Sequence, residues 1–431
     1  MKKIFFFLLL TAFAKTFHAQ SFDTLQQKSI LLTNAIVHIG NGTVYENGVI
    51  GFENGKITLV GDATTMRYDQ SKFAEIIDCA GKHIYPGLIA LNTPLGLREI
   101  DAARATVDNF ETGAINPNIR SLISYNTDSK VIPTIRSNGI LLAQVVPQGG
   151  LITGTSSVMK TDGWNWEDAV YAADNAMHIN WPGYYTFSFE EGNFRITVNK
   201  NYSDVVNSLK VFFDEAKAYS AVTNHAVQNV KFEAMRDVFE GKTKLFMHAN
   251  AAKDIINAVQ FAKQYQIVPV IVGGDECYKI LSFLKENNVP IILSTIHNLP
   301  VRNDDDIIQP YKLPSILQQA DIQYCISYND THWNMRNLPF LAGTAAANGL
   351  TKEQALQSIT LSAARILGIE TTVGSLDPGK DATLIICEGD VLDMKSSIIK
   401  DAYIQGIKVE TKNWQDDSYE KYSKKYGIKV R

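Results

Sequence analysis

The chain has few cysteines, and their spacing excludes two kinds of site. Four occur in 431 residues, and no two of them form a Cys-x-x-Cys pair. The sequence therefore has neither a zinc knuckle nor a thioredoxin-like redox motif. Three of the four lie in or beside apolar runs (IIDCAG, YCISY and LIICEG), where a thiol packs as a small hydrophobic group. The cysteines thus indicate core packing rather than chemistry.

An excess of positive charge is also missing. The chain carries 41 Lys and Arg against 45 Asp and Glu, a formal net charge of −4. Affinity for a nucleic-acid backbone comes mainly from Lys and Arg, so we expect no nucleic-acid partner.

No internal repeat of 20–50 residues is present, which argues against a solenoid.

Long hydrophobic runs are absent as well. The apolar stretch at residues 4–14 is too short to cross a bilayer, which takes about 20 residues. It follows Lys2 and Lys3, the order found in export signals. We predict that residues 1–19 are a signal peptide cleaved after Ala19. The mature chain is then exported, periplasmic or extracellular, without a membrane span.

Two styles of pattern divide the chain. Near both ends, residues 30–59 and 381–409 alternate short β-branched runs with tight-turn sequences such as Asn-Gly. Between them, apolar runs alternate with amphipathic segments, which predicts parallel strands covered by helices. The predicted fold class is α/β. It comprises a TIM-type (β/α)8 barrel at 86–370, a composite β-sandwich domain from 28–85 and 372–410, and a C-terminal extension at 411–431.

Polar and titratable side chains recur where the predicted barrel strands end. The carboxyl ends of parallel barrel strands form one face, and the chemistry of such barrels gathers there. A single polar residue at this place is more often an ordinary loop residue, but several together favour a ligand pocket. The residues are Asn92, Gln148, His248, Asp275, His297, Asp330 and His332.

Two other stretches of the predicted barrel have open interpretations. PQGGLITGT is rich in glycine but lacks the GK[ST] ending of a phosphate-binding loop, so we predict a close-approach turn that lines the pocket. A group of aromatic residues fits either the lining of a substrate mouth or ordinary loop packing. It comprises Trp164, Trp166, Trp181, Tyr184 and Tyr185.

Three motifs in the same order resemble the amidohydrolase superfamily, specifically its secreted imidazolonepropionase-like members. IDCAGKHIYPGLIALNTPLGL is similar to the family's D-x-x-G-K-x-x-x-P-G-L-I-D-x-H-x-H, and KLFMHANAAKDIINAV matches its central region. The third runs from RNLPFLAGTAAANGL to VGSLDPGKDATLIICEGD and is the most specific. The resemblance covers nearly the whole mature chain and implies a metal-dependent hydrolase barrel.

The resemblance also implies where the metal ligands of the family fall. Its paired histidines after the first strand correspond to Asn92 and Pro94, and its strand-six histidine corresponds to Gly273. The strand-five histidine is kept as His248, and the strand-eight aspartate corresponds to Asp330. A catalytic zinc site usually has three protein ligands, and only two of these positions retain one. The resemblance therefore predicts a largely lost metal site.

Three functions remain open at this point. The first is a hydrolase of non-peptide C–N bonds in cyclic amides or amidines, with Asp330 as general base, His248 on a metal or oxyanion, and zinc or another divalent metal as cofactor. The second is a binding protein without a tightly bound cofactor, in which His248, Asp275, His297 and Asp330 hydrogen-bond a small-molecule ligand and Asn92 replaces a metal contact. Gln148 and His332 are further candidate ligand-binding residues. The third is a structural partner of an intact paralogue. The family also implies homo-oligomers.

Overall fold

The computed structural model describes residues 28–190, 193–294, 296–300, 305–328 and 332–428. The predicted signal peptide at 1–19 lies outside these ranges, as does Asp330. Among the described residues, no helix is both long and apolar enough to pass through a membrane.

Strands from both ends of the chain pair in one sheet, in the order β18-β17-β16-β5-β1-β2-β3, with β4 beside β1. The sheet joins segments distant in sequence because β16 pairs antiparallel with β5. This pairing gives one sheet, and the two-sheet sandwich remains a prediction. The strands are β1 (Ile30–His38), β2 (Val44–Glu53), β3 (Lys56–Asp62), β4 (Glu75–Asp78), β5 (His83–Pro86), β16 (Leu384–Cys387), β17 (Ile399–Ile404) and β18 (Ile407–Val409).

A second sheet of eight strands forms the barrel region, in the order β15-β14-β13-β12-β9-β8-β7-β6. The sheet curls, since Ser327 after β15 donates a hydrogen bond to the Leu91 carbonyl in β6, at the opposite end of the strand order. The strands are β6 (Leu88–Thr93), β7 (Ile140–Val145), β8 (Ile152–Lys160), β9 (Val170–Asn180), β12 (Lys244–Ala249), β13 (Val270–Gly273), β14 (Ile291–Leu293) and β15 (Tyr324–Ile326).

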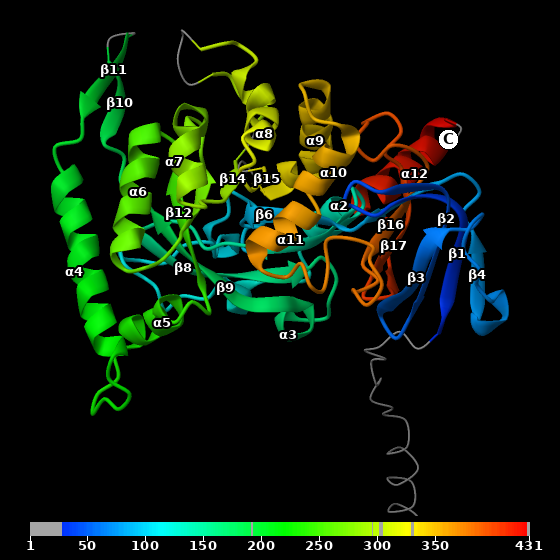
Figure 1. The fold of residues 1–431 in the computed structure, drawn as a ribbon, viewed down its shortest axis with the longest axis horizontal. Coiled ribbons are helices and arrows are strands. Elements are labelled where there is room, and N and C mark those ends of the chain that lie inside the picture. The colour runs from blue at the N-terminus through cyan, green and yellow to red at the C-terminus, as the bar shows by residue number, and fades with distance from the viewer. Residues whose placement is uncertain (1–27, 191–192, 295, 301–304, 329–331, 429–431) are drawn as a thin grey trace, which may run out of the picture.

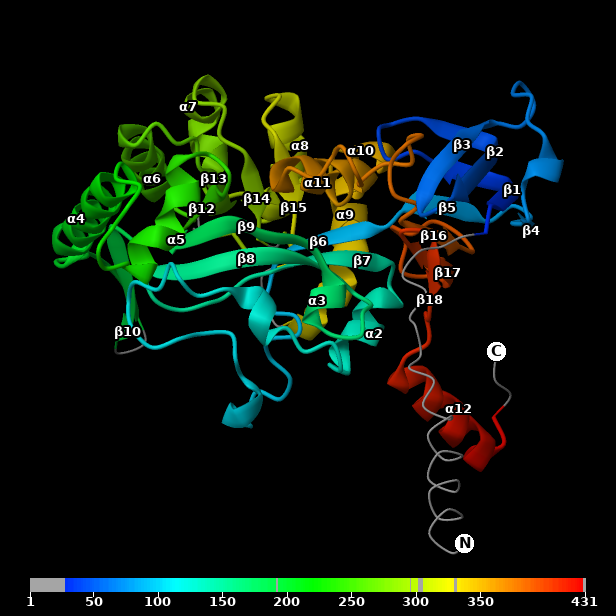
Figure 2. The same cartoon turned by 90° about the horizontal axis from the view of Figure 1, so that it is seen from below.

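One strand departs from the predicted parallel pattern. β8 runs antiparallel to both β7 and β9, and the long strands β8 and β9 lie side by side without a covering crossover helix between them (Figure 2). The chain reverses in the loop of residues 146–151 between β7 and β8, where Gly149 and Gly150 have φ angles of 82° and 67°. PQGGLITGT is therefore a hairpin turn followed by a strand.

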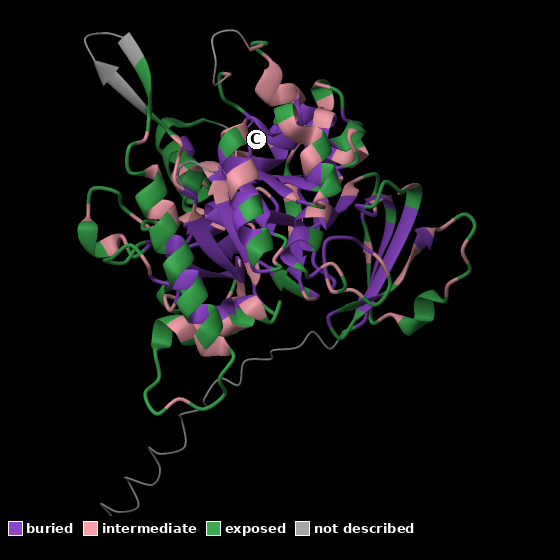
Figure 3. Cartoon of the chain, turned by 60° about the vertical axis from the view of Figure 1, so that its left-hand side comes forward, coloured by how far each residue is buried: buried purple, intermediate pink, exposed green. Residues whose placement is uncertain are grey.

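Helices cover the strands from β12 to β15, and most of them lie on one side of the curled sheet (Figure 2). In α6, residues 255, 258, 259 and 262 are buried, the spacing of one apolar helix face. Figure 3 shows the strands buried and the outer helix faces exposed. The helices are α2 (Val131–Arg136), α3 (Trp166–Ala169), α4 (Tyr202–Ser220), α5 (Val230–Phe239), α6 (Ala252–Gln264), α7 (Leu281–Glu286), α8 (Gln309–Gln319), α9 (Leu338–Ala347), α10 (Lys352–Ser358), α11 (Leu361–Leu367) and α12 (Trp414–Tyr426).

Two elements extend from this body. The hairpin of β10 (Tyr185–Glu190) and β11 (Asn193–Val198) pairs only with itself and projects beyond α6 (Figure 1). The C-terminal helix α12 contacts α2, because Thr134 donates a hydrogen bond to the Gln415 side chain at 2.9 Å. Arg136 also donates to the carbonyl of Glu410, in the segment before α12, at 2.6 Å.

A buried carboxylate joins the small sheet to the barrel. Asp381 accepts hydrogen bonds from Tyr171 of β9 at 2.7 Å and from Gln405 at 3.2 Å. It also forms an ion pair with Lys56 at 2.5 Å. Its partners come from both sheets, so its loss leaves polar groups without a partner at the junction.

We therefore predict that Asp381→Ala lowers the free energy of unfolding by about 2–4 kcal/mol, the range for breaking a buried charged network. Urea denaturation of the full chain measures the change. Asp237→Ala is the matched control, because this exposed carboxylate lies 3.7 Å from the Lys242 ammonium and should change stability little. Equal effects of the two substitutions would show that Asp381 does not join the sheets.

Candidate functional site

A cavity of about 920 Å³ opens where β9, β12, β13 and β14 end. Its walls come from these strand ends, the first turn of α6 and the β10–β11 hairpin. This is the face on which barrel enzymes carry their chemistry. The lining residues are Asn180, Trp181, Gly183, Tyr185, Ile196, His248, Ala249, Asn250, Ala251, Ala252, Lys253, Asp254, Val272, Asp275, Glu276, Lys279 and Ser294.

His248 is the imidazole in the cavity wall, and it is half-buried at the end of β12. A second histidine, His178 on the neighbouring strand β9, is fully buried behind it. The Nδ1 atom of His178 and the Nε2 atom of His248 are 3.0 Å apart. The two parallel strands place the rings together because Phe246 pairs with His178 in their register. One ring must donate a proton to the other.

The histidine pair continues into a line of buried polar groups across β8 and β7. The Nε2 atom of His178 lies 2.8 Å from the Ser156 hydroxyl, and Gln144 donates an amide hydrogen to that hydroxyl at 3.0 Å. The Gln144 carbonyl oxygen in turn accepts the backbone N–H of Asn92 at 3.3 Å. The line therefore runs from the end of β6 to the cavity wall.

The donors and acceptors in this line favour one arrangement of protons. Ser156 has one hydroxyl proton, for which the Asn175 side-chain oxygen at 3.2 Å and the Ala176 carbonyl at 3.3 Å are acceptors. Its oxygen then accepts from both Gln144 and His178. His178 consequently carries its proton on Nε2 and accepts one from Nε2 of His248. This assignment gives the Nδ1 atom of His248 an available lone pair.

Burial keeps both imidazoles neutral. Loss of solvent lowers the pKa of His248 from 6.5 to about 4. Burial, and then the neighbouring His248, lower the pKa of His178 well below its ordinary value. A neutral pair at pH 7 has one proton in its shared hydrogen bond, in agreement with the arrangement above.

The strand-six position is closed to a side chain. Gly273 has a φ angle of 109°, and a Cβ atom there would lie 2.0 Å from the Asn250 side-chain oxygen. Asn250 follows β12 and lines the cavity. Its amide therefore occupies the space that a residue at 273 would need, and a histidine there would first have to displace it.

The strand-one positions also differ from a pair of ligands. Asn92 has a φ angle of 54°, and the pairing of β6 with β7 shifts register between Ala90 and Thr93. Asn92 and Pro94 are both buried, and neither lines the cavity. Asparagine tolerates this left-handed backbone well, so the residue type fits the local bend.

The structure brings together only some of the residues predicted at strand ends. Asp275 shares the cavity with His248. The exposed His297 instead contacts Thr344 of α9, with Nε2 and Oγ1 2.7 Å apart. Gln148 accepts a hydrogen bond from Asn109 at 2.5 Å, and buried His332 lies at the start of the 3-10 helix η5 (His332–Asn337). Neither lines the cavity, and their ligand roles remain predictions.

Sequence reasoning missed the residues behind the cavity wall. His178, Ser156 and Gln144 each lie inside a strand rather than at its end, and all three are fully buried. The available signal was a polar residue within an otherwise apolar run, as in AMHIN and ILLAQV. Of the aromatic group, Trp181 and Tyr185 line the cavity, whereas Trp164 is exposed.

The described side chains do not form a zinc site. No group of three or more His, Cys, Asp or Glu in the described ranges could hold a metal ion. His178 and His248 provide two imidazoles, Asn250 fills the strand-six space, and Pro94 has no coordinating side-chain atom. A three-ligand zinc site does not fit this set.

Comparison with known proteins identifies the fold. Residues 315–412 match the amidohydrolase family. The chain is 48% identical over 63 residues to imidazolonepropionases of Bacillus thuringiensis (strain Al Hakam) and Bacillus cereus (strain AH187). That segment covers 14% of this chain and spans 14% of the length of each of these relatives.

Solved structures extend the likeness over most of the chain. An amidohydrolase from Thermotoga maritima MSB8 is 24% identical, with a TM-score of 0.75 over 88% of this chain and 99% of that one. The A. niger ochratoxinase is 12% identical, with a TM-score of 0.54 over 89% and 96%. The chain therefore has the amidohydrolase fold, and its C-terminal part carries sequence similarity to that family.

Asn250 and Gly273 give a testable coupling. We predict that Gly273→Ala destabilises the protein by about 2 kcal/mol or more, from backbone strain at positive φ and displacement of the Asn250 amide. In an Asn250→Ala background the cost should be smaller. Gly379→Ala is the control, since Gly379 has a φ angle of 88° and nothing within 4 Å. Its cost should be the same in both backgrounds. Denaturation midpoints of the single and double variants measure these costs. The same cost of Gly273→Ala in the wild-type and Asn250→Ala backgrounds would contradict the coupling.

The histidine pair predicts sensitivity to acid. The pKa of His248 is 6.5 in the unfolded reference and about 4 in the fold, so the unfolded chain binds the proton first as pH falls. Stability should be unaffected above about pH 7, fall between about 6.5 and 4, and then level off. We expect a contribution on the order of 1–2 kcal/mol by pH 5. Urea denaturation at pH 7.5 and 5.0 measures it, and His248→Gln should show a smaller decline. An identical decline would place the acid sensitivity elsewhere.

Proposed function

We propose that this chain is an amidohydrolase-superfamily protein that binds a small polar molecule at the barrel mouth without hydrolysing it. The supporting observation is the pairing of His248 with His178 at 3.0 Å beside an Asn250 amide that fills the strand-six space. Two neutral imidazoles and an amide make a hydrogen-bonding site. Among the described residues they fall short of the three ligands that a catalytic zinc needs.

In this proposal each group has a binding role. The Nδ1 atom of His248 accepts a hydrogen bond from the ligand, because Nε2 is engaged with His178. The Asn250 amide and the Ser294 hydroxyl both line the cavity and provide donors and acceptors. Trp181 adds a buried indole N–H that has no partner among the described residues.

Hydrolysis of non-peptide C–N bonds is the second candidate. It is supported by the family match at residues 315–412 and by the similarity to imidazolonepropionases. In that case Asp330 is the general base, and His248 stabilises an oxyanion or holds zinc or another divalent metal. Asp330 lies outside the described ranges, so this candidate rests on the comparisons and on the retained His248.

We also propose a location for the protein and an association with other chains. The sequence from Lys2 to Ala19 supports export to the periplasm or the medium, which fractionation and the N-terminal sequence of the mature protein would test. Association with a second copy or with an intact paralogue is a further proposal, to be tested by the mass of the native particle.

Metal and turnover distinguish the two candidate functions. We expect no near-stoichiometric metal in the purified protein, no micromolar zinc binding by calorimetry, and no hydrolysis of a hydantoin or another cyclic amide. Wild type should nevertheless be stabilised by small cyclic amides in a thermal-shift assay. His248→Ala should lose that stabilisation, measured against its own midpoint without amide, because the buried Nδ1 atom of His178 also loses its donor in this variant.

The matched control is His297→Ala, because His297 is exposed and contacts Thr344 outside the cavity. This variant should keep the wild-type response to the amides. Stoichiometric zinc together with turnover that only His248→Ala abolishes would instead establish the hydrolase.

A further inference from the structure

The charged side chains that line the cavity differ in whether they form hydrogen bonds or ion pairs with the described residues. Asp275 is half-buried and lines the cavity, yet its carboxylate makes no hydrogen bond or ion pair with the described residues. Its neighbour Glu276 is fully engaged. One oxygen lies 2.8 Å from the Lys279 ammonium, and the other accepts the Ala252 N–H at 3.0 Å. Asp275 therefore offers a charge that the protein itself does not balance.

The other charged residues of the cavity do not change this balance. Asp254 accepts the backbone N–H of Tyr184 at 2.9 Å. The Lys253 ammonium lies 3.1 Å from the centroid of the Tyr184 ring, a cation–π contact. In all, three carboxylates face two lysines, and His248 is neutral. The net charge of the lining residues is therefore negative. Asp275 is the carboxylate among them that forms no hydrogen bond or ion pair with the described residues.

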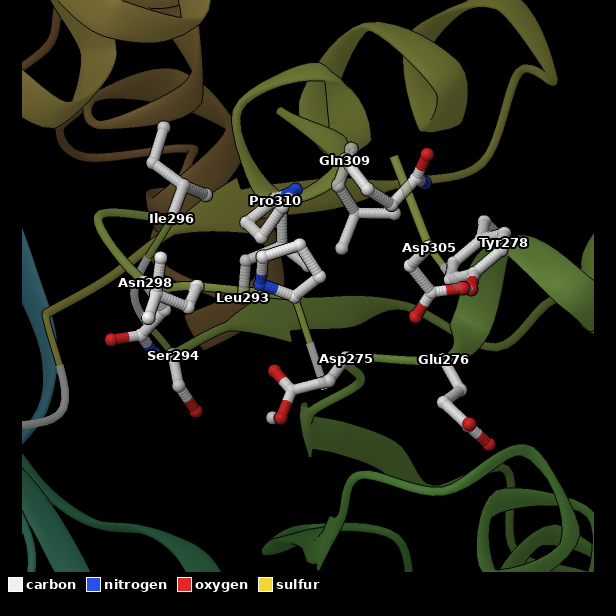
Figure 4. A pocket seen from close by; sticks show the side chains of 14 residues that line it. Asp275, Glu276, Tyr278, Leu293, Ser294, Ile296, Asn298, Asp305, Gln309 and Pro310 are labelled. Carbon is white, nitrogen blue, oxygen red and sulfur yellow. Dashed lines mark hydrogen bonds between the residues drawn. The ribbon is translucent and has the colours of Figure 1, made fainter. Parts of the chain in front are cut away.

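Figure 4 shows how neighbouring carboxylates diverge at this place. Asp275 and Glu276 are adjacent in sequence, but their side chains point to different sides, with Asp275 turned toward Ser294. Asp305, in the smaller hollow beside it, accepts a hydrogen bond from Tyr278 at 2.8 Å. Asp305 therefore has a hydrogen-bond donor within the protein, whereas Asp275 has none among the described residues.

Part of the cavity lining is apolar. Tyr185 and Ile196 from the β10–β11 hairpin line it together with Trp181 and Val272. Tyr185 and Ile196 are exposed, although they belong to residue types that usually pack. An apolar body placed between the hairpin and the strand ends would cover them.

We propose that the cavity selects a small organic cation, a primary or secondary amine with an aromatic or aliphatic body. Its ammonium pairs with Asp275, and its body packs against Tyr185 and Ile196. The inference rests on the proposed function, because it takes this cavity as the ligand site. An anionic ligand of the same shape is disfavoured, since it would meet the uncompensated carboxylate.

The ionisation of Asp275 predicts how the affinity for an amine changes with pH. Burial, and then the charge of Glu276, raise the pKa of Asp275 above 3.8. An ammonium binds only the ionised carboxylate, so affinity for an amine falls as pH decreases through this raised pKa. Affinity for an uncharged ligand of the same shape does not follow it.

Calorimetry with three probes that share a phenylethyl body tests the proposal on the full chain. The probes are 2-phenylethylamine, 2-phenylethanol and 3-phenylpropionate at pH 7.5. We expect the amine to bind at least about tenfold more tightly than the alcohol, and the carboxylate to bind least. Asp275→Asn should remove the advantage of the amine over the alcohol. Asp305→Asn, the matched control with its carboxylate held by Tyr278, should keep it.

The outcomes separate this inference from the proposed function. Preference for 3-phenylpropionate, or an amine affinity unchanged in Asp275→Asn, overturns cation selection. If the preferred probe then loses binding in His248→Ala, the cavity is still the ligand site. If no probe binds at millimolar concentration, the selection of an arylalkyl amine is overturned, while the cyclic-amide assay still decides the proposed function.

Discussion

The hydrogen bond between His178 and His248 fixes the orientation and the proton position of the imidazole at the mouth of this barrel. A fully buried imidazole lies 3.0 Å behind the imidazole in the cavity wall, and Ser156 and Gln144 complete its hydrogen bonding. Buried polar groups are costly unless they are satisfied, so this line fixes the ring orientation and the proton position of His248. The same burial that lowers the pKa of both rings keeps them neutral at physiological pH. The wall therefore presents a hydrogen-bonding imidazole rather than a cation.

The positions that the family resemblance assigns to metal ligands make contacts within the local structure. At strand six, Asn250 occupies the space beside Gly273, and at strand one the backbone of Asn92 bends and donates to Gln144. Both positions involve partners elsewhere in the barrel, so we predict that a single histidine placed there would not create a metal site. This coupling is the physical basis for placing ligand binding ahead of hydrolysis.

Periodicity was sufficient to predict much of the fold. Apolar runs followed by amphipathic segments located β12, α6, β13 and α7. Turn-rich runs at both chain ends predicted strands of a composite β-sandwich, and the structure pairs strands from both ends in one sheet. The reversal of β8 was missed, because the two left-handed glycines after β7 were taken as a turn lining the pocket. Strand-end position predicted His248 and Asp275 in the cavity. It could not place His297, since the direction of a loop side chain depends on tertiary contacts such as that with Thr344.

The state of His248 is the most direct test of this account. Nitrogen-15 chemical shifts of the histidine rings, assigned with His178→Gln and His248→Gln, report the proton position and any metal bond. At pH 7.5 we predict neutral rings for both residues, with the proton of His248 on Nε2 and no change on adding one equivalent of zinc. A zinc-dependent shift of the His248 Nδ1 resonance, or a protonated ring at that pH, would contradict the account.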